Sequence, residues 1–224
     1  MGVHDGHRQR LRERFLLHNL ESFHDVNALE LLLSYAIPRR DTNELAHSLL
    51  EHFGSLQAVL DASYQELIAF SGIGEQAASL IRLVPQLVKK AAVSQADQIH
   101  VCNTTELLRA YLEPRFMNER DEVLYMLCLD SRLAVICCTE IARGVVNGLD
   151  VGIRRVVEEA LKRRADAVVL AHNHPGGLAI PSVEDDFVTK QLSQALSSVQ
   201  IRLLDHLIFA GSDFTSYRCS GCLL

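Results

Sequence analysis

The sequence predicts a two-domain α+β protein, with an all-helical first domain followed by a sandwich of helices around a β-sheet. Two observations lead to this prediction. Residues 1–97 show helical periods broken by glycine and proline, without β-branched runs. From residue 98 to residue 224, short β-branched runs alternate with helical patterns of roughly ten to fifteen residues, which is typical of a sheet covered by helices.

The first domain reads as a series of helices. One leucine-rich helix should end before Pro38, and a second should run from Asn43 to His52. Ser63 and Glu66 have the spacing of a capping box at the start of a short helix. A longer helix should run from about Gln76 to Lys90.

Residues 91–97 lose the apolar period and become small and polar, so we expect the linker between the domains there. In the second domain, Asn103 and Glu106 should cap a helix that reaches about Tyr111. The remaining elements are expected as a hairpin of strands at 122–129 and 133–139, helices at 154–164 and 183–196, and strands at 167–171 and 201–210.

Composition limits the kinds of protein that the chain can be. It is 48% hydrophobic and 22% charged, as in soluble globular proteins, and no apolar run approaches the roughly 18–20 residues of a membrane-spanning helix. The first residues lack the pattern of a secretory signal. The six cysteines are therefore expected to be reduced thiols, and the expected location is the cytoplasm.

Charge argues against a dedicated nucleic-acid binder, because the net charge is −6. The one basic cluster consists of Arg8, Arg10, Arg12 and Arg14, which could form a single stripe on a helix. We favour a solvated helix face over a phosphate-binding surface for this stripe, and both interpretations stay open.

The chemistry is concentrated at the end of the predicted strand 167–171. His172 and His174 are two residues apart, so in extended chain both imidazoles point the same way. Pro175 keeps His174 extended, and Asp185 follows at the start of the next helix. Two imidazoles and one carboxylate give a tetrahedral Zn²⁺ three ligands and leave the fourth position for water, as in catalytic sites.

Simpler interpretations exist for the same residues. An isolated His-x-His is more often a pair of ordinary histidines, and Ser182 with Asp185 also has the spacing of a plain capping box. The conjunction favours a metal site, because both histidines leave a buried strand and the serine and aspartate begin the returning helix.

These residues resemble a known motif. His172-x-His174-Pro175, with Ser182 and Asp185 at their spacing, resembles the JAMM motif of MPN-domain metalloproteases. The longer string from His172 to Gly177 resembles the bacterial RadC family, whose members are called DNA repair proteins. The likeness extends over nearly the whole chain, through residues 6–15, Ser71–Gly74 and Leu204–His206.

The resemblance implies a zinc-dependent hydrolase that cleaves an amide or isopeptide bond in a peptide or protein. Its zinc would be bound by His172, His174 and Asp185, and Ser182 would hydrogen-bond the water on the metal or the developing oxyanion. Glu122, just before the first strand, would be the general base, and Glu140, just after the second strand, is the alternative candidate for this role.

The resemblance also implies a fold, the JAMM/MPN sandwich, which is similar to that of cytidine deaminases. A deaminase is disfavoured because the chain lacks a His-x-Glu with a following Pro-Cys-x-x-Cys.

A second function stays open. Ser71-Gly72-Ile73-Gly74 between two helices resembles a helix-hairpin-helix element, which binds DNA phosphates through backbone N–H groups. A DNA-associated repair or recombination accessory would use residues 71–75 and Arg8–Arg14, and its metal site would be structural or vestigial. A purely structural hairpin is an equal alternative.

Two further features carry weaker expectations. Cys219 and Cys222 are interpreted as an incidental surface pair, in preference to half of a zinc site or a redox pair. For Asp205-His206 we expect a role in the core or in support of a ligand, in preference to direct metal ligation.

Overall fold

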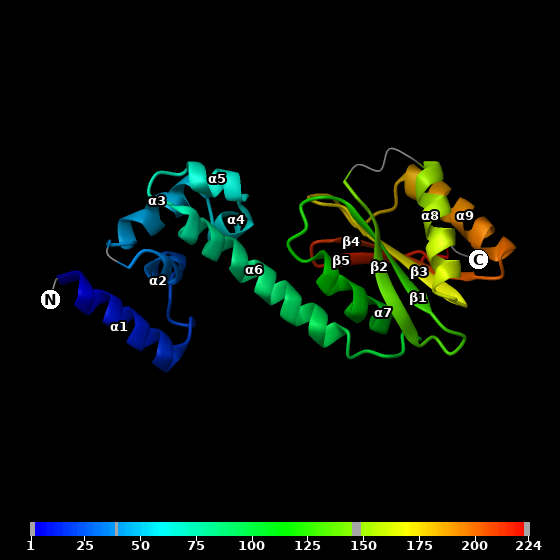
Figure 1. Cartoon of the computed structure of the whole chain (residues 1–224), viewed down its shortest axis with the longest axis horizontal. Coiled ribbons are helices and arrows are strands. Elements are labelled where there is room, and N and C mark those ends of the chain that lie inside the picture. Colours follow the sequence, from blue (N-terminus) through cyan, green and yellow to red (C-terminus); the bar gives the residue numbers. More distant parts are fainter. Residues whose placement is uncertain (1–2, 39, 145–148, 222–224) are drawn as a thin grey trace. The chain divides into compact units, whose positions relative to one another are not determined.

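The structure is a computed structural model, and it describes residues 3–38, 40–144 and 149–221. The chain separates into two compact units, residues 1–88 and 89–224, which we describe one at a time. The first is helical, and the second contains a five-stranded sheet with helices on both faces, which confirms the predicted fold class (Figure 1). The predicted domain boundary between residues 97 and 98 stays a prediction.

Helices α1 to α5 and the start of α6 build the first unit. Helix α2 ends before Pro38, as predicted, and Gly54 closes α3 with a left-handed φ of 89°. Both hydrogen bonds of the predicted capping box between Ser63 and Glu66 are present at the start of α5. The bounds are α1 Val3–His18, α2 Asp25–Ala36, α3 Asn43–Phe53, α4 Leu56–Asp61, α5 Tyr64–Ala69 and α6 Glu75–Ala96.

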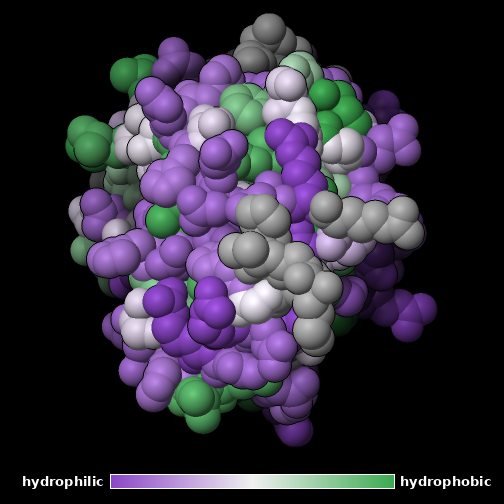
Figure 2. Space-filling view, turned by 90° about the vertical axis from the view of Figure 1, so that its left-hand side faces the viewer, coloured by the Kyte–Doolittle hydropathy of each residue, from purple (hydrophilic) through white to green (hydrophobic). Residues whose placement is uncertain are grey.

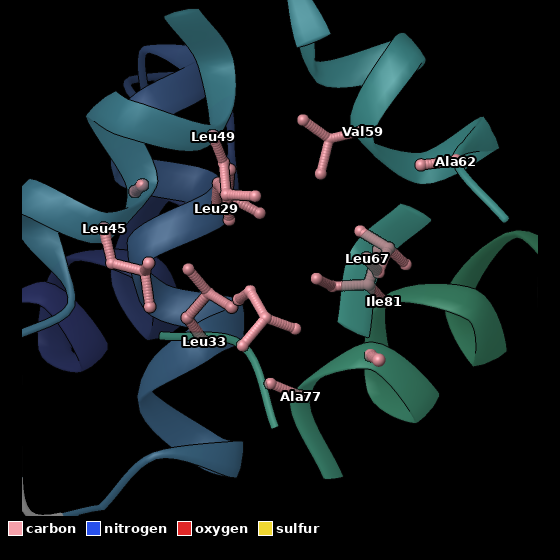
Figure 3. Packing of buried hydrophobic residues seen from close by; sticks show 12 residues of the cluster. Leu29, Leu33, Leu45, Leu49, Val59, Ala62, Leu67, Ala77 and Ile81 are labelled. Atoms are coloured by element: carbon pink, nitrogen blue, oxygen red, sulfur yellow. The ribbon is translucent and has the colours of Figure 1, made fainter. Parts of the chain in front are cut away.

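The core of the first unit is an apolar cluster that draws on every helix from α2 to α6. Figure 3 shows Leu29 and Leu33 of α2 together with Leu49 of α3, and all three side chains are completely buried. Val59, Leu67 and Ile81 add one side chain each from α4, α5 and α6. Because each helix contributes only a narrow apolar stripe, burial in this shared cluster is what stabilises the short helices.

The predicted helix end near Lys90 is wrong, because α6 continues to Ala96, so most of the segment expected as the linker, residues 91–97, is helical. Loss of the apolar period did not end the helix. This stretch contains Ala91, Ala92 and Ala96 together with Gln95, which are among the strongest helix formers, and no glycine or proline interrupts it.

The second unit contains one mixed sheet with the strand order β2-β1-β3-β4-β5. Neighbouring strands are antiparallel except β3 and β4, which run parallel and are joined through α9. The bounds are α7 Thr105–Leu112, the 3₁₀ helix η1 Glu113–Phe116, β1 Val123–Leu129, β2 Val135–Arg143, α8 Leu149–Lys162, β3 Ala167–Asn173, α9 Val183–Ser198, β4 Arg202–Ala210 and β5 Asp213–Ser216.

Helices cover both faces of this sheet. On one face, Met126 and Leu170 pack against α8 and α9 through Val156 and Leu192. On the other face, alternate residues of the same strands pack against Leu108 and Leu112 of α7. Residues two apart on β1 and β3 therefore share a face, which decides where the polar residues at the strand ends point.

Some details differ from the predictions. Thr104, not Asn103, caps α7, because its side chain accepts the hydrogen bond from the Leu107 N–H. Helix α4 and strand β5 were not predicted, since six and four residues are too few to show a period.

In the described residues, none of the helices combines the length and apolarity that a bilayer crossing requires. The face shown in Figure 2 is mostly hydrophilic, with hydrophobic residues in small separate groups.

Candidate metal centre

His172 and His174 lie at the carboxyl end of β3, on the face covered by α8 and α9. Their Nε2 atoms are 2.9 Å apart, so the two imidazoles converge as the two-residue spacing predicts. A second contact holds the other side of the His174 ring, because its Nδ1 lies 3.0 Å from the carbonyl oxygen of Leu178. His172 is buried, whereas His174 is partly accessible.

Asp185 completes the cluster from the first turn of α9. Its Oδ1 lies 3.2 Å from His172 Nε2, and its Oδ2 lies 3.4 Å from His174 Nε2. Ser182 caps the same helix, and Asp185 Oδ2 accepts hydrogen bonds from both the backbone N–H and the hydroxyl of Ser182 (2.8 and 2.7 Å). The capping box and a metal site are therefore compatible, because the box holds Oδ2 through Ser182 while Oδ1 makes only the contact with His172 Nε2.

The three side chains fit a metal ion in their spacing and in their chemistry. Among the described residues, His172, His174 and Asp185 form the group that could hold such an ion. A tetrahedral zinc ion with nitrogen and oxygen ligands at about 2.0–2.2 Å separates its ligand atoms by about 3.3 Å. The two Nε2 atoms are 2.9 Å apart and Asp185 Oδ1 lies 3.2 Å from His172 Nε2, which are both close to that value. One ligand atom from each of the three residues lies within 4.8 Å of the other two.

The electrostatics of the cluster favour a charged carboxylate. Burial alone would raise the pKa of Asp185, but the hydrogen bond and charge of His172 and the hydrogen bonds from Ser182 lower it well below its usual value. The positive end of the α9 dipole adds to this effect. Asp185 is therefore ionised at neutral pH, as a metal ligand must be.

His206 on β4 contacts the cluster from the buried side. Its Nε2 lies 2.8 Å from His172 Nδ1, and its Nδ1 lies 2.6 Å from the hydroxyl of Thr189 on α9. Tyr217 stacks on the ring at a centroid distance of 5.1 Å. Burial lowers the pKa of His206 well below its usual value, so this ring is neutral. His206 contacts His172 and lies outside the His172–His174–Asp185 group.

Strand register assigns the two candidate bases, Glu122 and Glu140, to opposite faces of the sheet. Leu124 pairs with His172, and the hydrogen bond from Gly144 N to Glu122 O (2.9 Å) extends the β1–β2 ladder to Glu122. By alternation, Glu122 is directed to the face of the histidines. Glu140 pairs with Tyr125, so it lies on the other face, where Arg143 binds it at 2.8 Å.

Asn173, between the two histidines, holds the backbone on both sides of Glu122. Its Oδ1 accepts the hydrogen bond from Val123 N (2.8 Å), and its Nδ2 donates to Asp121 O (3.0 Å). The regular β1–β3 pairing stops at Leu124 and His172, so the buried Asn173 side chain replaces the next backbone bonds. Sequence reasoning missed this residue; an amide in a buried strand was the available signal.

The candidate DNA-binding residues are largely engaged inside the first unit. Arg8 donates to the carbonyls of Ile37, at 3.0 Å, and Pro38. Arg14 donates to Asn27 at 3.1 Å and stacks on Phe23, so the stripe is not an open row of free cations.

The hairpin at residues 71–74 has a packing explanation. A side chain on Gly72 would lie 3.1 Å from Leu45, and its φ of 95° also requires glycine. At the other end of the chain, Cys219 is exposed and forms a 3.4 Å contact with the hydroxyl of Thr105. Cys222 lies outside the described residues.

Comparison with known families agrees with this architecture. The family model described as RadC-like JAB domain matches residues 102–222, and the model described as UPF0758 N-terminal matches residues 6–79. The first match spans the sheet and all of the residues described above as the metal centre.

Curated relatives match over nearly their whole length. UPF0758 protein BPP1850 of Bordetella parapertussis is 35% identical over 212 residues, which cover 95% of this chain and 94% of the relative. UPF0758 protein Bpet3149 of Bordetella petrii is 36% identical over 215 residues, with 96% of each chain covered.

Proposed function

This chain belongs to the RadC family, and from that premise we propose that it is a zinc-dependent hydrolase that cleaves an amide or isopeptide bond. The observation that carries the proposal is the convergence of His172, His174 and Asp185 at the end of β3, with separations close to those of a tetrahedral site. Three protein ligands leave a coordination position open, which distinguishes a catalytic zinc from a structural one.

When bound, zinc supplies a Lewis acid and lowers the pKa of a water molecule to about 7. His172 and His174 would hold the ion through their imidazoles, and Asp185 would hold it through its carboxylate. The backbone N–H of Ser182 keeps Asp185 in place. In this proposal the Ser182 hydroxyl, which donates its one proton to Asp185 Oδ2 in the structure, turns to donate it to the negative charge that develops on the substrate carbonyl.

Glu122 is the proposed general base. Its carboxylate takes a proton from water and delivers it to the leaving nitrogen, which must depart as a neutral amine. The direction of Glu122 to the face of the histidines supports this role, as do the bonds from Asn173 and Gly144 that fix the backbone at residues 121–123. Glu140 is disfavoured because it pairs with Tyr125 on the opposite face.

The surface next to the cluster supports a peptide or protein as the substrate. Leu178, Ile180, Val183 and Phe187, which flank His174 and Asp185 in the chain, are between 50% and 80% exposed. Leu178 and Ile180 also line a surface cavity of about 470 Å³, together with Arg109 and Phe214. Exposed apolar side chains in this concentration are typical of a binding surface.

The test is hydrolysis of an internally quenched peptide and isopeptide library by zinc-loaded protein. We expect Glu122→Gln to lower the rate at least about 100-fold while zinc remains bound. Glu140→Gln is the matched control and should retain the rate. Equal losses in both variants, or full activity in Glu122→Gln, would contradict the proposed base.

The DNA-associated alternative and the cytoplasmic location remain predictions. The alternative is tested by binding of single-stranded and branched DNA across a salt series. An affinity that falls steeply with salt would support it, because phosphate contacts release counterions. A flat or absent response would count against it.

A further inference from the structure

His206 and Thr189 have no part in the catalytic steps proposed above, yet both are buried and both lie in a chain of contacts that ends on His172. This series consists of two contacts between side chains. The first is His172 Nδ1 to His206 Nε2 at 2.8 Å, and the second is His206 Nδ1 to Thr189 Oγ1 at 2.6 Å. His206 and Thr189 are each 3% exposed, so solvent does not compete for these bonds.

Two proton arrangements satisfy both links, because a neutral imidazole has one N–H and one lone pair. In the first, His172 Nδ1–H donates to His206, and His206 Nδ1–H donates to Thr189. In the second, Thr189 donates to His206 Nδ1, and His206 Nε2–H donates to His172. The two arrangements differ in what they leave at the Nε2 atom of His172.

Only the first arrangement leaves a lone pair on His172 Nε2, which is the atom that faces His174 and Asp185. In the second arrangement the His172 proton sits on Nε2 and blocks it as a ligand. Metal-binding histidines usually donate their other N–H to a carboxylate, a carbonyl or water, and this contact fixes both tautomer and ring orientation. Here a second imidazole occupies that position.

We propose that His206 and Thr189 are positioning residues that hold His172 in its Nδ1-protonated tautomer and so keep His172 Nε2 available to a metal ion. The proposal rests on the proposed metal site. The three residues of this hydrogen-bonded series come from three elements, since His172 lies on β3, His206 on β4 and Thr189 on α9. Tyr217 holds the His206 ring plane by stacking at an interplanar angle of 15°.

The first test is the zinc affinity of the full chain, measured by competition with a chromophoric chelator. We expect Thr189→Val, which keeps the shape and removes the hydroxyl, to weaken zinc binding roughly 10-fold, and His206→Leu to weaken it by about 10- to 100-fold. Thr189→Ser and His206→Gln are the matched controls, because each retains the polar atoms needed. Both should bind zinc more tightly than their apolar counterparts.

The second test reads the proton positions directly. The ¹⁵N shifts of the ring nitrogens should show His206 protonated at Nδ1 in both the metal-free and the zinc-loaded wild type. Protonation of His206 at Nε2, or zinc binding by Thr189→Val and His206→Leu as tight as that of wild type, would overturn the inference. A wild type that binds no zinc would overturn the proposed function instead, and the metal-free tautomer would still decide this point.

Discussion

The two units bury polar side chains in different ways. In residues 1–88, the buried polar residues among those described are Glu30, Ser34 and Thr42, and their bonds are made within the helical unit. In residues 89–224, they are Thr105, Arg115, His172, Asn173, Thr189, Asp205, His206 and Ser216. Four of these eight are in or next to one cluster at the end of β3: His172, Asn173, Thr189 and His206.

This difference shows where the second unit concentrates its buried polar side chains. Burying a polar group costs free energy unless it is paired, so a concentration of buried polar residues in one place needs a reason. In the first unit the apolar cluster forms the core, and the buried Glu30 carboxylate accepts a hydrogen bond from Asn43 Nδ2 at 2.8 Å. In the second, the polar residues hold two imidazoles and a carboxylate with their ligand atoms about 3 Å apart.

The largest effect on stability should come from the apolar core of the first unit. Leu49 is completely buried, so Leu49→Ala should lower the free energy of unfolding of that unit by about 2–5 kcal/mol. Zinc affinity should not change. Urea unfolding followed by methyl NMR signals of each unit measures the first effect and chelator competition the second. Weakened zinc binding in Leu49→Ala would contradict the expectation that zinc affinity does not depend on the core of the first unit.

Asn173→Ala should affect both stability and chemistry. It leaves Val123 N and Asp121 O without their partner, at a cost of about 1–3 kcal/mol per buried group. The Val123 amide should exchange faster, and hydrolysis should fall while zinc stays bound. Asn43→Ala in the first unit, which removes a bond to Glu30, is the control and should leave hydrolysis unchanged. Unchanged exchange at Val123 would refute the role of Asn173.

Alkaline pH should destabilise only the second unit through its thiols. Burial raises the pKa of Cys102 to about 11 and that of Cys128 to about 12, whereas an unfolded thiol ionises near about 8.5. Their contribution to stability is therefore fully present below about pH 8.5 and is lost as the pH rises towards the folded pKa values. Residues 1–88 contain no cysteine.

This pH dependence is measured by urea unfolding of each unit at pH 8 and pH 10.5 under reducing conditions. Cys102→Ala should flatten the pH dependence of the second unit. Equal losses of unfolding free energy in both units would mean that groups other than the buried thiols dominate the pH dependence.

The smallest effects come from two matched capping boxes. Ser63 caps α5 in the first unit, and Ser182 caps α9 beside the two histidines, with the same pair of reciprocal bonds. Ser63→Ala and Ser182→Ala should each cost about 1 kcal/mol of stability. Only Ser182→Ala should also weaken zinc binding, because only its partner Asp185 faces the histidines. Equal zinc affinities in the two variants would show that the box does not orient the ligand.

Local patterns in the sequence were enough to predict much of the fold and the convergence at the site. The two-residue period of an extended chain aligned His172 with His174, and the capping spacing put Asp185 at a helix start. Ser63 and Glu66 were predicted for the same reason. Each of these relations spans only a few residues, so no knowledge of distant packing was required.

The parts that escaped prediction depend on contacts between distant segments. Asn173 finds its partners about fifty residues earlier in the chain, and Thr189 meets His206 only because α9 packs on β4. The continuation of α6 through Ala96 is an exception, because the alanines of residues 91–96 are a local signal for helix even though the apolar period is missing there.

Zinc titration of wild type beside Asp185→Ala tests whether the two histidines and the aspartate bind a metal ion, with cobalt substitution to report the geometry. We expect one ion per chain in wild type, a tetrahedral cobalt spectrum, and loss of binding in Asp185→Ala. Wild type without a bound ion, or Asp185→Ala that binds as tightly as wild type, would contradict it.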